Sequence, residues 1–216
     1  MNSLAAFSTE TTPAAVQCDP DARLQASRRV DWRFLLPEAG LGDTVYAGCS
    51  DSLLIDALRQ FSTRLTILEP GASRLAKSSP FALAVANNPS RSELCQAADL
   101  LSPGGFLYVE VDRRWSRQWR ARHPHSSHRP RSVRSCLAMI QQCNLSQPQV
   151  HWHWPNFELC NEMIPLGQRH AVVCAMNRRG SGWRAWWKKR LGQALLETGL
   201  IAGLVPCFSV LAQRSS

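Results

Sequence analysis

The feature that most constrains the fold is the alternation of strand-like and helix-like segments between residues 43 and 111. Short apolar runs typical of buried strands occur in DTVYAGC (43–49), RLTILEP (64–70), FALAVANNP (81–89) and FLYVEV (106–111). Apolar residues at helical spacing occur in DSLLIDALRQF (51–61) and SRSELCQAADLL (90–101), and SPGG (102–105) is expected to stop the second helix. Strands that alternate with helices form a parallel sheet with helices packed on it, so the sequence predicts an α/β fold.

The second half of the chain has a less regular pattern. RSVRSCLAMIQQCNL (131–145) predicts a helix, and QVHWHWPNFELC (149–160) and EMIPL (162–166) predict extended segments. HAVVCAM (170–176) predicts another strand, and SGWRAWWKKRLGQALLETG (181–199) predicts an amphipathic helix that ends at a glycine. PCFSVLAQR (206–214) predicts a terminal strand.

Composition and charge narrow the class of protein. The chain has 216 residues, of which 44% are hydrophobic, so it can bury a sizeable core. Its net charge of +9 is concentrated in residues 113–134, which hold eight arginines, and in RRGSGWRAWWKKR (178–190). Such segments suit an acidic ligand, nucleic acid or peripheral contact with an anionic surface; the alternative is a solvated loop. The tryptophans of 183–187 either lie at such a surface or pack inward.

The N-terminus and the cysteines bear on the compartment. The first 23 residues have no basic start and no long apolar run, and the apolar stretch 195–212 is broken by Glu197, Pro206 and glycines. We therefore expect no signal peptide and no transmembrane segment. The eight cysteines include no C-x-x-C pair, which predicts scattered apolar thiols in a reducing, cytoplasmic setting.

Three strand ends carry candidate binding residues. They are Ala47, Gly48, Cys49, Ser50 and Asp51 after the first strand, Glu69 and Pro70 after the second, and Asn87 and Asn88 after the third. In open α/β sheets, ligands bind at the carboxyl ends of the strands. A glycine there admits a close ligand, and a carboxylate can accept both hydroxyls of a ribose. The alternative is that Glu69 only ends a strand and the asparagines only make a turn.

The order of these segments resembles class I S-adenosylmethionine-dependent methyltransferases. LLSPGGFLYVEV (100–111) resembles that family's L-x-P-G-G-x-L entry to a strand, and VYAGCSDS, LTILEP and FALAVANN resemble the three preceding motifs over about residues 30–112. The resemblance implies a Rossmann-like mixed sheet, mostly parallel with an antiparallel C-terminal strand, between helices on both faces (three-layer αβα). It also implies S-adenosylmethionine as cofactor, held by the strand-end residues given above.

Several positions depart from the family pattern. Tyr46 replaces the acid before the first glycine, Ser50 and Ser52 replace the other two loop glycines, and Ala82 replaces an acid. The link between Glu69 and Phe81 is too short for a helix and a strand, so the sheet is predicted to be one strand short.

The sequence pattern and the resemblance together predict a division of the chain. Residues 1–22 are predicted to be a flexible arm, and 23–216 a single methyltransferase-like domain. Within it, about 30–112 form the cofactor half, 113–131 a basic loop, and 132–216 the acceptor half.

The catalytic candidates follow the fourth strand and lie in the histidine-rich segment. Methyl transfer needs positioning and, for an oxygen or nitrogen nucleophile, a base. Glu110, Asp112, His151 and His153 are candidates, and the two histidines share one face of a strand while Trp152 and Trp154 share the other. HWHWPNFELCNEMIPL is either a substrate wall or part of the core. No metal site is predicted, because only Cys160 offers itself as a third ligand.

Three functions remain open at this point. The first is methyl transfer to a small-molecule or glycan-type acceptor. The second is a catalytically inactive methyltransferase-like protein that binds or scaffolds, as the altered glycine loop suggests. The third is an RNA methyltransferase or nucleic-acid binder, which only the charge favours. A nicotinamide dehydrogenase is disfavoured, because G-x-G-x-x-G would need glycines where Ser50 and Leu53 stand.

Overall fold

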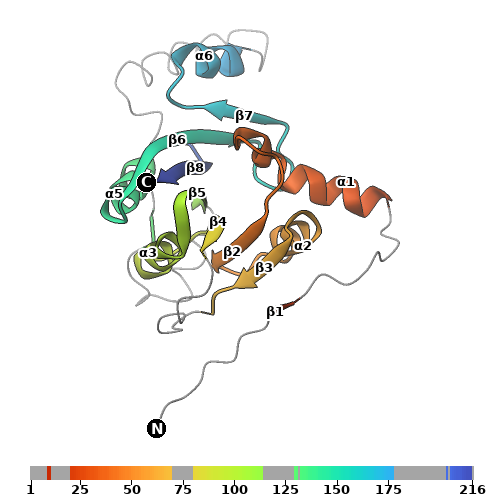
Figure 1. Cartoon of the computed structure of the whole chain (residues 1–216). Helices are drawn as coiled ribbons and strands as arrows, with labels where there is room; N and C mark the ends of the chain where they lie inside the picture. Colours follow the sequence, from red (N-terminus) through yellow and green to blue (C-terminus); the bar gives the residue numbers. More distant parts are fainter. Residues whose placement is uncertain are drawn as a thin grey trace, which may run out of the picture.

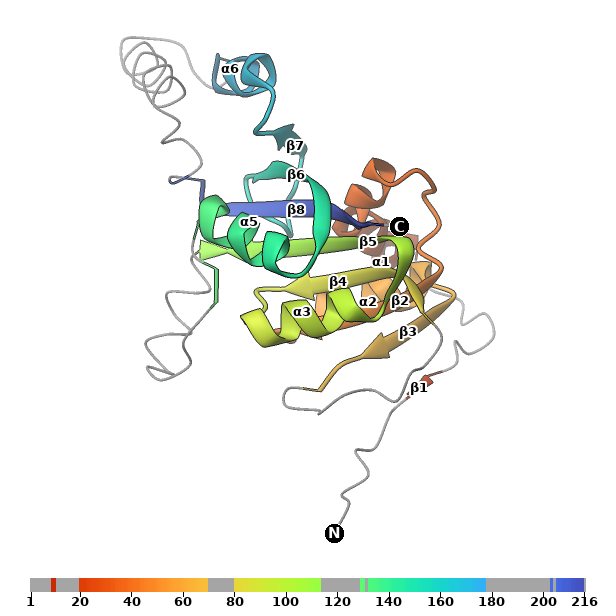
Figure 2. The same cartoon turned by 60° about the vertical axis from the view of Figure 1, so that its left-hand side comes forward.

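A computed structural model describes residues 9–10, 20–69, 80–113, 129–130, 132–177, 203 and 205–215. These residues form one eight-stranded sheet in the order β1-β3-β2-β4-β5-β8-β6-β7 (Figures 1 and 2). The strands are β1 (Thr9–Glu10), β2 (Asp43–Gly48), β3 (Arg64–Ile67), β4 (Phe81–Asn87), β5 (Leu101–Asp112), β6 (Leu145–Trp154), β7 (Glu162–Pro165) and β8 (Cys207–Arg214).

The strand directions confirm the predicted fold class. β2 pairs in parallel with β3 and β4, and β4 pairs in parallel with β5. β8 is antiparallel to both β5 and β6, so β6 runs in the same direction as β5. β7 and β1 are antiparallel strands at the two edges. The last strand in the chain is therefore inserted antiparallel into a sheet whose other central strands run one way.

The strand that is predicted to be missing would lie at the sheet edge beyond β3. In the described part of the chain, β1 from the predicted N-terminal arm pairs there, with Thr9 opposite Thr66. Residues 70–79, which link β3 to β4, lie outside the described residues, as do most of the basic loop 113–131 and the predicted helix 181–199.

Helices pack on both faces of the sheet, as predicted. α3 (Arg91–Asp99) and α5 (Val133–Gln142) cover one face, where Leu94 and Ile140 join a core of strand residues. α2 (Ser52–Phe61) and the 3-10 helix η1 (Asp31–Leu35) cover the other face, with Leu54 and Trp32 in its core. α1 (Pro20–Arg29) lies beside α2.

Local sequence explains where the sheet-covering helices begin. Asp51 caps α2 by accepting the backbone N–H of Leu54 at 3.1 Å. Ser90 and Glu93 form a capping box at the start of α3, and Ser132 forms one with Ser135 at the start of α5. Each cap satisfies backbone donors that a helix start leaves without an intrahelical partner.

Two predicted elements are wrong. Residues 170–176 were predicted as a strand, but they belong to α6 (Arg169–Asn177). Val172 and Ala175 are buried three positions apart, a helical spacing, and pack with Ile164 of β7 in a small separate cluster. A short apolar run fits both structures, and periodicity alone does not separate them. SPGG was predicted to lie outside the fourth strand, but it lies inside β5, where the pairing with β4 shifts register.

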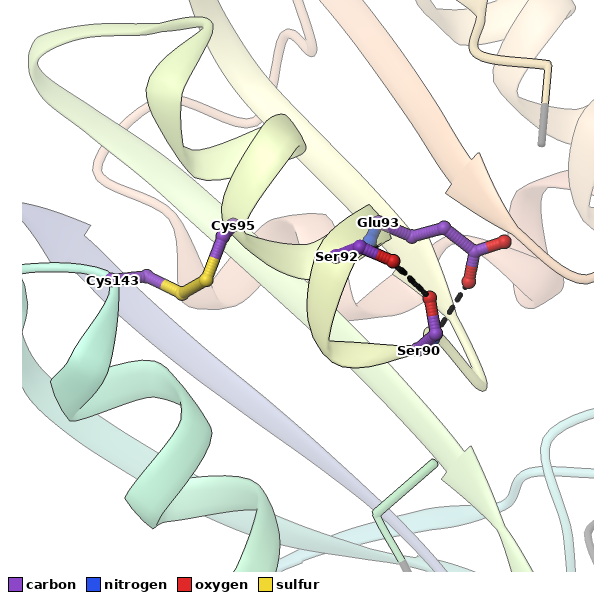
Figure 3. The surroundings of a disulfide bond; sticks show 5 residues. All are labelled: Ser90, Ser92, Glu93, Cys95 and Cys143. Atoms are coloured by element: carbon purple, nitrogen blue, oxygen red, sulfur yellow. Dashed lines mark hydrogen bonds between the residues drawn. A yellow bond between two sulfur atoms is a disulfide. The ribbon is translucent and has the colours of Figure 1, made fainter. Parts of the chain in front are cut away.

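The cysteines also differ from the prediction of scattered thiols. Cys95 of α3 and Cys143, which follows α5, form a disulfide with their Cα atoms 5.3 Å apart (Figure 3). The bond joins the two helices that cover one face of the sheet. The described cysteines outside this disulfide are Cys49, Cys136, Cys160, Cys174 and Cys207.

Candidate functional site

The carboxyl ends of β2, β4 and β5 meet at one edge of the sheet, as the sequence predicts. Gly48 ends β2 with a φ of +98°, and a Cβ atom at this position would lie 2.3 Å from the carbonyl oxygen of Asn87. The backbone N–H of Cys49 donates to the same oxygen at 2.8 Å. Gly48 is therefore required by the close approach of the β4 backbone, not only by any ligand.

Asn87 and Asn88 tie the strand ends together. The Asn87 side-chain amide donates to the carbonyl of Cys49 at 3.3 Å, and its oxygen accepts from the Asn88 amide at 2.9 Å. The Asn88 side-chain oxygen accepts the backbone N–H of Asp112 at 2.8 Å. These two candidate binding residues thus use their side-chain groups in hydrogen bonds within the protein.

Arg29, at the end of α1, is the central charge of the site. Its guanidinium donates two hydrogen bonds to the carboxylate of Glu110, at 2.7 and 2.6 Å, and one to Asp51 at 2.9 Å. Arg29 is 6% exposed and Glu110 is fully buried. Burial by itself disfavours the charge of Arg29, but Glu110 and Asp51 outweigh it and raise its pKa. The site therefore contains a buried ion pair, in which Arg29 holds the carboxylate of the catalytic candidate Glu110 in place.

A second arginine lies over the same strand ends. Arg129 donates to the Cys49 thiol at 2.8 Å and to the Asn88 carbonyl, and its guanidinium is 3.6 Å from the Glu93 carboxylate. Burial raises the pKa of Cys49 to about 12 despite this arginine, so the thiol stays protonated at neutral pH. Cys49 is accordingly a packing and hydrogen-bonding residue.

The buried His153 belongs to a polar network on the face of the sheet near α1. Its Nε2 lies 2.8 Å from the Ser209 hydroxyl and 3.5 Å from that of Tyr108, and its Nδ1 lies 3.4 Å from the Cys160 sulfur. Tyr108 in turn donates to Glu110 at 3.2 Å. Burial first, and then Arg29 and His151, lower the pKa of His153 to about 3. His153 is therefore a neutral ring with partners on both nitrogens.

His151 differs from His153 in its partners. It lies directly across from Ser209, which lies across from Glu110, so the three residues form a row over β6, β8 and β5. Burial lowers the pKa of His151, and its buried Nδ1 has no hydrogen-bond partner among the residues that the structure describes. Of the four catalytic candidates, His151 is the one with a buried ring nitrogen that has no hydrogen-bond partner among the described residues.

The remaining predicted residues separate into buried and exposed ones. Ala47 is buried in the core, Ser50 and Glu69 are exposed, Asp112 is partly buried, and Pro70 lies outside the described residues. Trp152 packs against the core on the face opposite the histidines, and its ring contacts that of Trp154 edge-on at 5.6 Å. Within the described ranges, no group of three histidines, cysteines or acids could hold a metal ion, and no helix is long and apolar enough to cross a membrane.

Sequence reasoning missed Arg29, Tyr108 and Ser209. Arg29 stands in RLQASRRV next to a second arginine, and nothing in that pattern marks which of the two is buried. Tyr108 and Ser209 stand in segments with an ordinary strand pattern. The one available signal was the alternation along β5, which places Tyr108 on the same face as Glu110.

Comparison with known proteins adds solved structures of low similarity. No protein-family model and no curated protein matches the chain. A methyltransferase from Thermotoga maritima, described as a possible histamine N-methyltransferase, is 13% identical, with a TM-score of 0.47 over 90% of this chain and 91% of that one. The N-methyltransferase NodS from Bradyrhizobium japonicum is 12% identical, with a TM-score of 0.44 over 93% of this chain and 100% of that one. Likeness at this level does not carry over an activity or a substrate.

The fold assignment rests on the chain's own topology. β3, β2, β4 and β5 form the parallel part of the sheet, and the C-terminal β8 is inserted antiparallel between β5 and β6. The order reverses between β2 and β4, where Gly48 and Asn87 meet. The chain therefore has the Rossmann-like fold of class I S-adenosylmethionine-dependent methyltransferases, with an arginine from its N-terminal helix in the strand-end site.

Proposed function

We propose that the protein binds S-adenosylmethionine at the carboxyl ends of β2 and β3 and transfers its methyl group to a small-molecule acceptor. The observation that carries the proposal is the exposed carboxylate of Glu69. Glu69 lies two residues beyond the pairing of Tyr46 with Ile67, which places it level with Gly48 on the neighbouring strand. An exposed carboxylate at this point fits the two hydroxyls of a ribose.

The methionine end of the cofactor fits the described residues less directly. Asp51 and the start of α2 lie where that end would be held, and Asp51 is engaged by Arg29. The bound cofactor would supply an activated methyl group, so the protein's own contribution is to orient the acceptor and to accept a proton. No metal is needed for either task.

His151 is the base that we propose for proton removal. Glu110 is held by Arg29, and both nitrogens of His153 have partners, whereas Nδ1 of His151 has none among the described residues. Because burial lowers the pKa of His151, the ring is neutral at pH 7 and able to accept a proton. The burial of Glu110, His151 and His153 supports a small-molecule acceptor in this proposal.

The second candidate is a catalytically inactive protein that uses the fold for binding. The specific observation that favours it is that the polar side chains of the site hydrogen-bond to one another and to the backbone. The side chains of three candidate residues form hydrogen bonds with neighbouring protein groups: Asn87, Asn88 and Glu110. Such a site holds its shape without a cofactor.

The first experiment is calorimetric titration with S-adenosylmethionine and S-adenosylhomocysteine. The wild type, Glu69→Ala and Glu38→Ala are compared, since Glu38 is an exposed acid in the segment before the amino end of β2. Micromolar binding that Glu69→Ala loses and Glu38→Ala keeps would support the proposal. Absence of heat at millimolar ligand would contradict it and favour the inactive candidate. Once an acceptor is found, His151→Asn should lower kcat by about 10²- to 10⁴-fold.

A further inference from the structure

α1 is buried only at its last residue. Of its ten residues, only Arg29 is buried, while Ala26 and Ser27 are half-buried and Leu24 is exposed. A helix of this length is only marginally stable on its own, and α1 has no buried apolar face to hold it. The ion pairs of Arg29 with Asp51 and Glu110 therefore attach the end of the helix to the strand ends, beside the packing of Ala26 against the core and the contact of α1 with α2.

The surroundings of the Arg29 guanidinium form a cation-binding environment. Two carboxylates accept its hydrogen bonds, and the ring of Phe157 lies 5.6 Å from its central carbon. A carboxylate pair beside an aromatic face is an arrangement that binds guanidinium and ammonium groups. In addition, the buried Nε–H of Arg29 has no acceptor among the described residues, so the site does not satisfy the guanidinium completely.

We propose that this position is a subsite for a cationic acceptor, and that Arg29 occupies it in the free protein as an internal substitute. The acceptor's ammonium or guanidinium group replaces Arg29 between Asp51 and Glu110, and α1 is released when this happens. The inference rests on the proposed function for the role of the ligand as methyl acceptor. The existence of the subsite follows from the contacts of Arg29 alone.

The buried charge of Glu110 decides the chemical class of ligand. If Arg29 left without replacement, a fully buried carboxylate would lose its counter-charge, which is strongly unfavourable. A neutral or anionic ligand cannot compensate for that loss. A cation that donates hydrogen bonds restores the lost counter-charge, so the subsite favours ammonium and guanidinium groups over neutral alcohols and carboxylates.

The test is chemical rescue of Arg29→Ala, with Arg28→Ala as the matched control. Arg28 is the preceding residue of the same helix and is exposed. Thermal unfolding of both variants and the wild type is followed with guanidinium chloride at low millimolar concentration, and with urea as a neutral analogue. We expect Arg29→Ala to melt lower than Arg28→Ala and to regain several degrees with guanidinium alone, because a ligand that binds only the folded state raises the midpoint. A guanidinium effect no larger than that on Arg28→Ala would overturn the proposal.

A second measurement on the wild type covers the case in which Arg29→Ala does not fold. Hydrogen exchange of residues 20–29 is compared with and without agmatine, with α5 (Val133–Gln142) as the internal reference. Faster exchange in α1 but not in α5 would support displacement of Arg29; unchanged exchange in α1 would overturn it. Neither experiment uses S-adenosylmethionine. Rescue without cofactor binding therefore refutes the proposed function alone, and cofactor binding without rescue refutes the subsite alone.

Discussion

Removing the disulfide between Cys95 and Cys143 should lower the free energy of unfolding substantially. The bond closes a loop of 48 residues, and it restricts the unfolded chain far more than the folded one. For a loop of this length the chain-entropy relation gives a stabilisation of about 4 kcal/mol at 25 °C. The folded protein loses little, because Cys95 lies on α3, Cys143 directly follows α5, and these two helices cover the same face of the sheet (Figure 3).

The assay compares unfolding of the wild type with that of the double variant Cys95→Ser/Cys143→Ser. For a protein of this size, about 4 kcal/mol corresponds to a fall in Tm of roughly 9 °C. The wild type in excess dithiothreitol should have the same Tm as the double variant. Cys174→Ser, which removes an exposed free thiol, should have the same Tm as the untreated wild type. A difference below about 1 kcal/mol between the wild type and the double variant would refute the loop-closure argument.

Two further predictions concern a backbone contact and a buried ring. Gly48→Ala should destabilise the protein by about 3 kcal/mol or more in denaturant titration, because the new Cβ would meet the Asn87 carbonyl at a positive φ. Gly40→Ala, with open space around it, should have little effect. Equal effects of the two substitutions would contradict this account of Gly48. The folded-state pKa of His153, about 3, lies below the unfolded value near 6.5, so the unfolded chain takes up the proton first as the pH falls. The contribution of His153 to the free energy of unfolding should therefore decline below pH 6.5, by up to about 1.4 kcal/mol per pH unit, and level off near pH 3. His153→Asn should flatten this dependence in pH-resolved denaturation, and His170→Asn, at an exposed position, should leave it unchanged.

Much of the fold could be predicted because its periodicities are local. The helical spacing in residues 51–61 and the apolar run 81–87 each depend on neighbours within the same segment. The convergence of Gly48, Asn87 and Glu110 then follows from a general property of parallel sheets, whose strand ends meet at one edge.

The rest depends on contacts between distant residues, which a single sequence does not encode visibly. The Arg29–Glu110 pair spans 81 positions, and the disulfide spans 48. Whether residues 170–176 form a strand or a helix depends on the partner that buries Val172, here Ile164 of β7. The role of Gly48 was predicted as admitting a ligand; its tightest neighbour is the backbone of the adjacent strand.

The position of β8 has a consequence for the order in which the protein can be completed during synthesis. β8 follows every other strand of the sheet in the chain, yet it lies between β5 and β6 and carries Ser209, the link between Glu110 and His151. Until β8 leaves the ribosome, β5 and β6 present unpaired edges to each other, and such edges favour aggregation of nascent chains. The strand-end site can therefore assemble only as one of the last events of folding, after translation has passed residue 214.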